Sequence, residues 1–140
     1  MKVVRYDPFH LPDLRALYYL SRQTAFPWED PSGYTLLDFD LVTQDESILV
    51  AVDQQRPVGF ISWWPPDNFI HSLFVDPAFI RKGVGKSLLQ ACLAHIGRPA
   101  TLKCKTANQN ALQFYYAQGW LPIDTVVDAG DPYLLLAFNG

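Results

Sequence analysis

The chain has 140 residues, of which 49% are hydrophobic and 18% are charged, and its formal net charge is −3. This composition excludes an intrinsically disordered chain, and the length fits a single domain over residues 1–140 with its own hydrophobic core. The slightly acidic balance also excludes the basic surface typical of nucleic-acid binding, so no nucleic-acid partner is expected.

The first third of the chain predicts one strand followed by two helices. Lys2–Tyr6 is a short apolar run that opens a sheet. Leucines recur near the helical period over Leu11–Leu20, and Pro12 suits a first helical turn. The run FPWEDP at 26–31 ends that helix in a loop, and a second helix is expected roughly over Tyr34–Thr43.

The hydrophobic period then changes from helix to strand. Ser47–Asp53 and Val58–Trp64 are β-rich runs, and the segment 54–57 between them predicts a hairpin. Phe69–Val75 predicts a third strand, which ends at the Asp-Pro pair 76–77.

The rest of the chain predicts two helices and three strands. A helix begins after Gly85 and buries the face Leu88, Leu89, Cys92, Leu93 and Ile96. Thr101–Lys105 reads as a strand, and Asn108 caps a helix over Gln109–Gln118 that ends at Gly119. Two closing strands follow at 120–127 and 133–138, joined by a loop at 128–132.

The order β-α-α-β-β-β-α-β-α-β-β predicts an α/β mixed sheet. Antiparallel hairpins flank a central βαβ unit, so helices are expected on both faces of the sheet.

Neither cysteine nor histidine spacing indicates a metal site. Cys92 and Cys104 form no CxxC pair, and His10, His71 and His95 have no ligand spacing. Both cysteines are predicted to be small buried hydrophobic residues rather than nucleophiles. No charged leader precedes an apolar stretch and no run is long enough to span a bilayer, so a cytoplasmic protein without a membrane partner is expected.

The segment Phe74–Leu89 (FVDPAFIRKGVGKSLL) carries the most specific signal. A buried strand runs into a loop with Gly83 and Gly85, and a helix follows at once. Such a loop lets backbone N–H groups approach an anion, and the N-terminus of the helix adds its positive dipole end. The basic side chains of Arg81, Lys82 and Lys86 surround the same point. A phosphate-bearing ligand is therefore predicted here, with a plain glycine turn as the alternative.

A nucleotide-binding P-loop is a second interpretation of the same glycines. That motif needs a glycine five positions before Gly85, where this chain has the β-branched Ile80. No later strand ends in an aspartate placed to hold magnesium. The P-loop interpretation is therefore rejected.

Two motifs resemble the GCN5-related N-acetyltransferase (GNAT) family. The family's coenzyme A loop, Q/R-x-x-G-x-G/A, matches residues 80–85 at both glycines but has Ile80 in place of the leading Gln or Arg. Its second motif, N-x-x-A-x-x-x-Y-x-x-x-G-F, matches residues 108–120, with Trp120 in place of the final Phe. The resemblance covers nearly the whole chain and is most specific over 70–120.

The resemblance implies an acetyl-CoA-dependent N-acyltransferase without a metal. It implies that acetyl-CoA lies between two parting parallel strands, 72–75 and 101–105, and pairs with the backbone of Leu73, Phe74 and Val75. It implies further that the pyrophosphate sits on the amides of the loop and helix start (Arg81, Lys82, Gly83, Val84, Gly85, Lys86 and Ser87). Asn108 matches the position that contacts the pantetheine arm.

The same resemblance implies catalytic roles. A neutral amine attacks the thioester directly, a backbone N–H near Phe74 stabilises the oxyanion, and Tyr115 matches the family's general acid. His71 has the same parity as Phe69, Leu73 and Val75 on its strand, so alternation predicts that they share a face. Because histidine ordinarily titrates near pH 6.5, His71 is the candidate general base, with Asp67 or a water path as alternatives. Expected acceptor-site residues are Trp28, Glu29, Trp63 and Trp64, where aromatic rings beside an acid suit a cation.

The acceptor amine, of a small molecule or a protein, stays open at the level of sequence. A non-catalytic acyl-CoA sensor is the alternative function, and Ile80 is the feature that suggests it. Because homodimers are common in the family, the resemblance also admits a homodimer.

Overall fold

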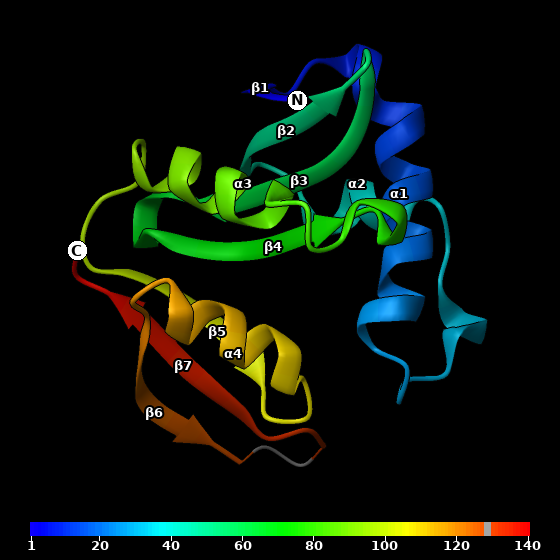
Figure 1. The fold of residues 1–140 in the computed structure, drawn as a ribbon. Coiled ribbons are helices and arrows are strands. Elements are labelled where there is room, and N and C mark those ends of the chain that lie inside the picture. Colours follow the sequence, from blue (N-terminus) through cyan, green and yellow to red (C-terminus); the bar gives the residue numbers. More distant parts are fainter. Residues whose placement is uncertain (128–129) are drawn as a thin grey trace.

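The computed structural model describes residues 1–127 and 130–140, and a seven-stranded sheet runs through them (Figure 1). Its strands lie in the order β1-β2-β3-β4-β5-β7-β6. Only β4 and β5 are parallel, and every other neighbouring pair is antiparallel. The strands are β1 (Lys2–Arg5), β2 (Ser47–Asp53), β3 (Arg56–Trp64), β4 (Phe69–Val75), β5 (Ala100–Lys105), β6 (Leu121–Val126) and β7 (Tyr133–Phe138).

Helices cover both faces of this sheet, which confirms the predicted α/β mixed-sheet fold. The helices α1 (Leu11–Ala25) and α2 (Asp38–Val42) pack on one face, and α3 (Val84–Leu93) and α4 (Gln109–Ala117) pack on the other. Short 3-10 turns lie at Pro8–His10, Pro31–Gly33, Pro65–Asp67 and Pro77–Phe79. Within the described part of the chain, no helix combines the length and apolar character needed to cross a bilayer.

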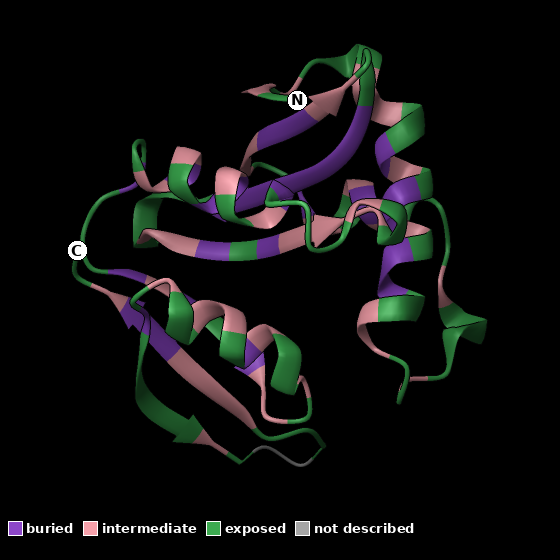
Figure 2. Ribbon diagram, in the orientation of Figure 1, coloured by how far each residue is buried: buried purple, intermediate pink, exposed green. Residues whose placement is uncertain are grey.

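Two hydrophobic clusters hold the layers together, and Figure 2 shows them as buried stretches along the central strands. The larger cluster joins α3 and α4 to the sheet, with Leu88 and Leu112 among its members. The smaller one joins α1 and α2 to the opposite face through Leu14, Phe39 and Phe60. A Cβ on Gly59 would lie 3.1 Å from the side chain of Leu88, so glycine at this position of β3 lets α3 approach closely.

The predicted hairpin between β2 and β3 is present and is tighter than expected. Gln54 and Gln55 both adopt positive φ, +49° and +68°, as a two-residue turn with left-handed residues requires. The strand β3 therefore begins at Arg56, two residues earlier than predicted.

Other predicted boundaries also differ from the structure, that of the second helix most of all. The second helix is only Asp38–Val42, because the backbone N–H of Thr35 donates to the Asp38 carboxylate and fixes a non-helical turn before it. Trp120 precedes β6 instead of belonging to it, and it is fully buried under α4. Of the predicted loop 128–132, Asp128 and Ala129 lie outside the described residues.

The feature that positions the candidate site is the separation of β4 from β5. The two strands pair only at Phe69 with Thr101 and at Ile70 with Leu102, and then diverge (Figure 1). Beyond Ile70, the edge of β4 that faces β5 has no strand partner in the described sheet, while β5 stays paired with β7 to Lys105. An unpaired inner edge of this kind is where an extended ligand can be added as a strand.

Candidate active site

The glycine turn before α3 leaves its first backbone N–H groups without an intramolecular cap. Gly83 occupies the N-cap position with φ +80°, a left-handed conformation suited to glycine, and no side chain caps the helix. A Cβ on Gly83 would meet no described atom within 4 Å, so the turn faces open space. The turn therefore has the geometry of an anion cradle.

Positive charge surrounds this turn, as the sequence predicts. Arg81, Lys82 and Lys86 are exposed, and none forms an ion pair with another described residue. Lys82 lies over the ring of Phe79, with its Nζ 5.2 Å from the ring centroid. Ile80 is 47% exposed, and its side chain supplies no charge to the turn.

Gly85 lies where three predicted site segments meet. A Cβ added at Gly85 would lie 3.6 Å from the Phe114 ring of α4 and 3.7 Å from the Val75 side chain at the end of β4. The start of α3, the open edge of β4 and the helix α4 thus converge around one glycine. They are separated in sequence by up to 39 positions, the interval from Val75 to Phe114.

Tyr115 packs on the core side of α4, next to the rings of Phe114 and Trp120 at 5.2 and 6.0 Å between centroids. Its neighbour Tyr116 is 37% exposed, so the two tyrosines point in different directions. Burial raises the pKa of Tyr115, and the nearby Cys104 thiol adds to the increase. Its hydroxyl makes no hydrogen bond to a described residue. The phenol is therefore protonated at neutral pH, and its proton is not donated to any described residue.

Asn108 caps α4 as predicted. Its side-chain oxygen accepts a hydrogen bond of 3.2 Å from the backbone N–H of Ala111. This bond occupies the carbonyl end of the amide and leaves its NH₂ group as the donor available to another partner.

His71 lies at the point where β4 leaves β5, but the expected alternation along β4 is wrong. Ser62 pairs with Ser72 and Trp63 pairs with Ile70, so His71 is an extra, bulged residue. The bulge shifts the pattern, and Ile70 and Leu73 consequently pack into the same core. His71 therefore does not share a face with Leu73 and Val75. It points to the other face and is 45% exposed there.

The loop after α1 reaches across the gap between β4 and β5. Glu29 of this loop forms an ion pair with Lys105 at the end of β5, and Tyr34 donates a 2.7 Å hydrogen bond to Glu29. Lys105 also lies 3.3 Å from a carboxylate oxygen of Asp131. Burial opposes ionisation of Glu29, yet the hydrogen bonds from Lys105 and Tyr34 lower its pKa overall. Burial and the bond to Glu29 raise the pKa of Tyr34 to about 12.

Aromatic rings connect this loop to β4. Trp28, which is 41% exposed, packs against Phe26 at 5.6 Å, and Phe26 packs edge-on against Phe74 at 5.8 Å. Trp28 and Glu29 therefore lie beside the strand segment expected to bind the thioester. This places both predicted acceptor residues next to the split in the sheet.

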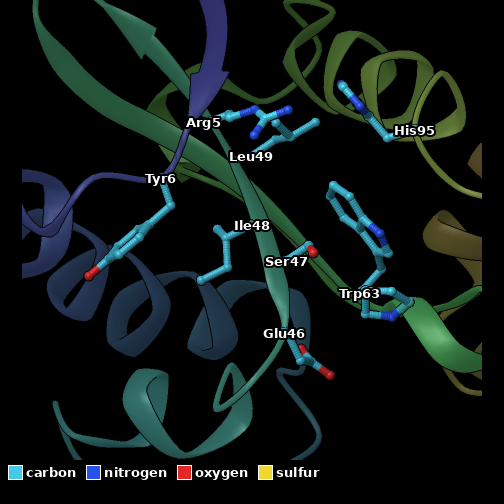
Figure 3. Close-up of a pocket in the computed structure, with 9 residues that line it drawn as sticks. Arg5, Tyr6, Glu46, Ser47, Ile48, Leu49, Trp63 and His95 are labelled. Atoms are coloured by element: carbon cyan, nitrogen blue, oxygen red, sulfur yellow. The ribbon is translucent and has the colours of Figure 1, made fainter.

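The other two predicted acceptor residues lie elsewhere. Trp63 is 7% exposed, belongs to the core under α3 and stacks on His95 with 6.4 Å between ring centroids. It lines a cavity of about 460 Å³ beside the end of β1, which Arg5 and Glu46 also line (Figure 3). Trp64 is half-exposed at the end of β3, and Asp67 is exposed in the following turn. The structure does not bring these residues to Glu29.

Three residues that the sequence analysis did not single out for the site take part in its contacts. Lys105 and Tyr34 hold Glu29, and Glu46 contacts His71. The contacts of Lys105 with Glu29 and of Glu46 with His71 join segments 76 and 25 positions apart, for which a single chain carries no local signal. The contact of Tyr34 with Glu29 spans only five positions. Among the described residues, no group of three or more His, Cys, Asp or Glu is arranged to hold a metal ion.

Both cysteines are buried, as predicted, and we expect them to be unreactive in the folded protein. Burial raises the pKa of Cys92 to about 12 and that of Cys104 to about 11. Since the thiolate is the reactive form, less than about 5% of each thiol should react with a disulfide reagent within minutes at pH 8. Both should react after denaturation. Rapid labelling of the native protein would contradict the buried placement.

Comparison with known proteins agrees with this geometry. The model of the acetyltransferase (GNAT) family matches residues 12–120. The solution structure of apo YjaB from Escherichia coli is similar at 26% identity and a TM-score of 0.77, covering 97% of this chain and 95% of that one. No curated protein sequence gives a significant match.

Two further solved structures share the fold at lower identity. One is the ribosomal-protein-S18-alanine N-acetyltransferase from Escherichia coli, at 16% identity and a TM-score of 0.75, covering 99% of this chain and 92% of that one. The other is an aminoglycoside 6′-N-acetyltransferase complexed with coenzyme A, at 16% identity and a TM-score of 0.76, covering 99% and 97%. The family match spans most of the chain, and the glycine turn, the split sheet and α4 all lie within the matching fold. The chain belongs to the GNAT family of acetyltransferases.

Proposed function

We propose that this protein transfers the acetyl group of acetyl-CoA to a primary amine of a small molecule or a protein, by direct attack in a ternary complex. We propose also that residues 1–140 form one catalytic domain. The observation that carries the proposal is the convergence at Gly85 of the uncapped start of α3, the unpaired edge of β4 and the helix that bears Tyr115. These three features suit the phosphate, pantetheine and thioester parts of one extended ligand.

The residues present fit this cosubstrate. The backbone N–H groups from Gly83 to Lys86 lie at an uncapped helix start, and exposed basic side chains at 81, 82 and 86 add charge for the pyrophosphate. The Ser87 N–H, also predicted to bind there, instead donates to the carbonyl oxygen of Gly83 at 3.0 Å. The edge of Leu73–Val75 offers backbone groups to the pantetheine arm, and the Asn108 NH₂ group is a second donor for it. A related structure that shares the fold binds coenzyme A.

Each reactive side chain has one task in the proposed chemistry. Acetyl-CoA supplies a thioester, in which the C–S bond breaks as the C–N bond to the amine forms. A backbone N–H near Phe74 donates to the carbonyl oxygen, and Tyr115 gives its phenolic proton to the departing thiolate. The proton that the nitrogen loses as it becomes an amide then restores the Tyr115 phenol. His71 takes the proton that the acceptor ammonium must lose before its nitrogen can attack. His71 and Tyr115 approach the split sheet from opposite faces, which suits a ternary complex.

Trp28 and Glu29 support a cationic acceptor. The half-exposed indole ring of Trp28 and the Glu29 carboxylate lie in a loop that Phe26 connects to Phe74. An ammonium group there would gain ring-face contact with Trp28 and would share the Glu29 carboxylate with Lys105. The fold relatives act on an aminoglycoside amine and on a ribosomal-protein alanine. Kanamycin, a peptide with N-terminal alanine, a lysine peptide and spermidine therefore make a suitable panel of probe amines.

Calorimetric titration with acetyl-CoA, coenzyme A and ATP is the first test. Binding of acetyl-CoA without ATP, followed by thiol release with one of the probe amines, is the expected result. Binding without release from any amine would favour the non-catalytic sensor. Failure of both CoA forms to bind would overturn the proposal.

Replacing Gly83 with Val should weaken binding of acetyl-CoA about 10-fold or more. A β-branched residue at φ +80° costs on the order of 1–3 kcal/mol and places carbon atoms where the cradle is open. Calorimetry measures the affinity, and thermal melting separates it from the expected loss of stability.

Gly33→Ala is the matched control for this change. Gly33 also has open space around its Cβ direction but does not adopt a positive φ, so the affinity for acetyl-CoA should stay unchanged. Equal affinity of the Gly83→Val variant and the wild type would refute the anion cradle.

A further inference from the structure

Glu46 is a buried carboxylate whose one side-chain partner in the described structure is His71. Its side chain is only 8% exposed, and Oε2 lies 3.0 Å from Nδ1 of His71. The other oxygen, Oε1, is buried and accepts no hydrogen bond from a described residue. Burying a carboxylate is unfavourable unless it is paired, so the contact with His71 offsets part of the cost of burying Glu46.

The sheet explains why two residues 25 positions apart meet. Glu46 directly precedes β2 and follows the same alternation as Ile48 and Val50, which pack on the α1 face. The bulge in β4 turns His71 to that face as well. Between them, β3 contributes Ser62, which pairs with both Ile48 and Ser72 and whose small side chain leaves room for the contact.

The carboxylate determines which ring nitrogen of His71 carries the proton. A neutral imidazole has one N–H and one lone pair, and the hydrogen bond at one nitrogen selects the tautomer. A carboxylate can only accept, so it requires the proton on Nδ1 and leaves the lone pair on Nε2. The exposed part of the ring is then the basic part.

We propose that Glu46 is a positioning residue that holds His71 as the Nδ1–H tautomer, with Nε2 directed to the acceptor amine. This inference rests on the proposed function, because it makes His71 the base of the acetyl transfer. In the proton transfer, Nε2 takes a proton from the acceptor ammonium and the ring becomes imidazolium. The Nδ1–H bond to Glu46 is kept throughout, and Nε2 later returns its proton to water.

Nitrogen-15 NMR of the histidine rings tests the tautomer without any substrate. The chain has only three histidines, and His10 supplies an internal reference. The backbone N–H of Asp7 donates to Nδ1 of His10 at 3.1 Å, so neutral His10 must be the Nε2–H tautomer. At a pH where the rings are neutral, His71 should show the opposite pattern, Nδ1–H. An Nε2–H form of His71 in the wild type would overturn the inference, whatever any variant does.

Glu46→Met then tests the positioning role, since Met keeps the length of the side chain and accepts no strong hydrogen bond. His71 should move toward the Nε2–H form, and kcat with the best probe amine should fall about 10-fold or more, with the affinity for acetyl-CoA unchanged. Asp40→Asn is the matched control, because it removes a carboxylate paired with Arg15 on the same face that does not contact His71. It should change neither readout.

The two proposals fail in different ways. A wild type that transfers acetyl groups and a Glu46→Met variant with the same kcat or the same tautomer would overturn the role of Glu46 alone. A wild type that transfers no acetyl group to any probe amine would overturn the proposed function, even with His71 held as Nδ1–H.

Discussion

Tyr115→Phe should lower kcat about 100-fold while the affinity for acetyl-CoA changes less than about 2-fold. The substitution removes only the hydroxyl, which makes no hydrogen bond to a described residue, so no partner is left unsatisfied. The ring keeps its contacts with Phe114 and Trp120. A loss confined to kcat is the signature of a group that acts in the transition state.

The raised pKa of Tyr115 predicts how activity and stability depend on pH. Burial, with the Cys104 thiol, raises it above the ordinary value of 10, so the phenol keeps its proton across the range in which most amines are assayed. Activity should therefore show no loss from ionisation of Tyr115 between pH 7 and about pH 10. The same upward shift means that Tyr115 contributes stability below pH 10 that is lost as the pH rises through the folded-state value.

Tyr116→Phe is the control, because this residue is adjacent but exposed. Steady-state kinetics with the best probe amine and calorimetry with acetyl-CoA measure the two quantities separately. A Tyr115→Phe enzyme with weak cosubstrate binding and normal kcat would show that Tyr115 packs against the ligand and does not act as an acid.

Most of the fold could be predicted because its signals are local. Ser47–Asp53, Phe69–Val75 and Tyr133–Phe138 form strands with the predicted bounds, since each is a short β-rich run between turn residues. The N-cap at Asn108 could be predicted for the same reason, because the capping side chain directly precedes the helix. The second helix was predicted too long, because its apolar pattern is poor and the turn before Asp38 is set by a side-chain bond.

The residues of the candidate site that belong to short motifs could also be predicted from the sequence, whereas the side chains that contact His71 and Glu29 could not. Gly83, Gly85 and Tyr115 belong to short motifs, and the spacing of such motifs can be recognised in a single sequence. The bulge at His71 is a property of how β4 pairs with β3, so strict alternation gave the wrong face. The contacts of Glu46 with His71 and of Lys105 with Glu29 join segments 25 and 76 positions apart, which only the sheet brings together.

His71→Ala should lower the rate about 10- to 100-fold at pH 7 and recover most of the loss near pH 9.5. An alkyl ammonium with a pKa near 10.4 is neutral in only about 1 of 2,500 molecules at pH 7, and in about 1 of 10 at pH 9.5. A base that removes the proton in the site is therefore valuable at neutral pH and nearly redundant in alkaline solution. The ratio of wild-type to variant kcat/KM, measured across this range with one probe amine, reports the contribution of the base.

Two further variants separate proton transfer from structure. His71→Gln retains an N–H donor for the buried Glu46 carboxylate but has no basic nitrogen, so it should match the pH profile of His71→Ala with a smaller loss of stability. His95→Ala removes a histidine that stacks on Trp63 away from the split in the sheet, so its profile should match the wild type. If His71→Ala and the wild type gave parallel profiles, the proton would leave by another route, such as a water path. The bulge that exposes His71 lies at the point where β4 parts from β5, so the strand would then be irregular at the split without supplying the base.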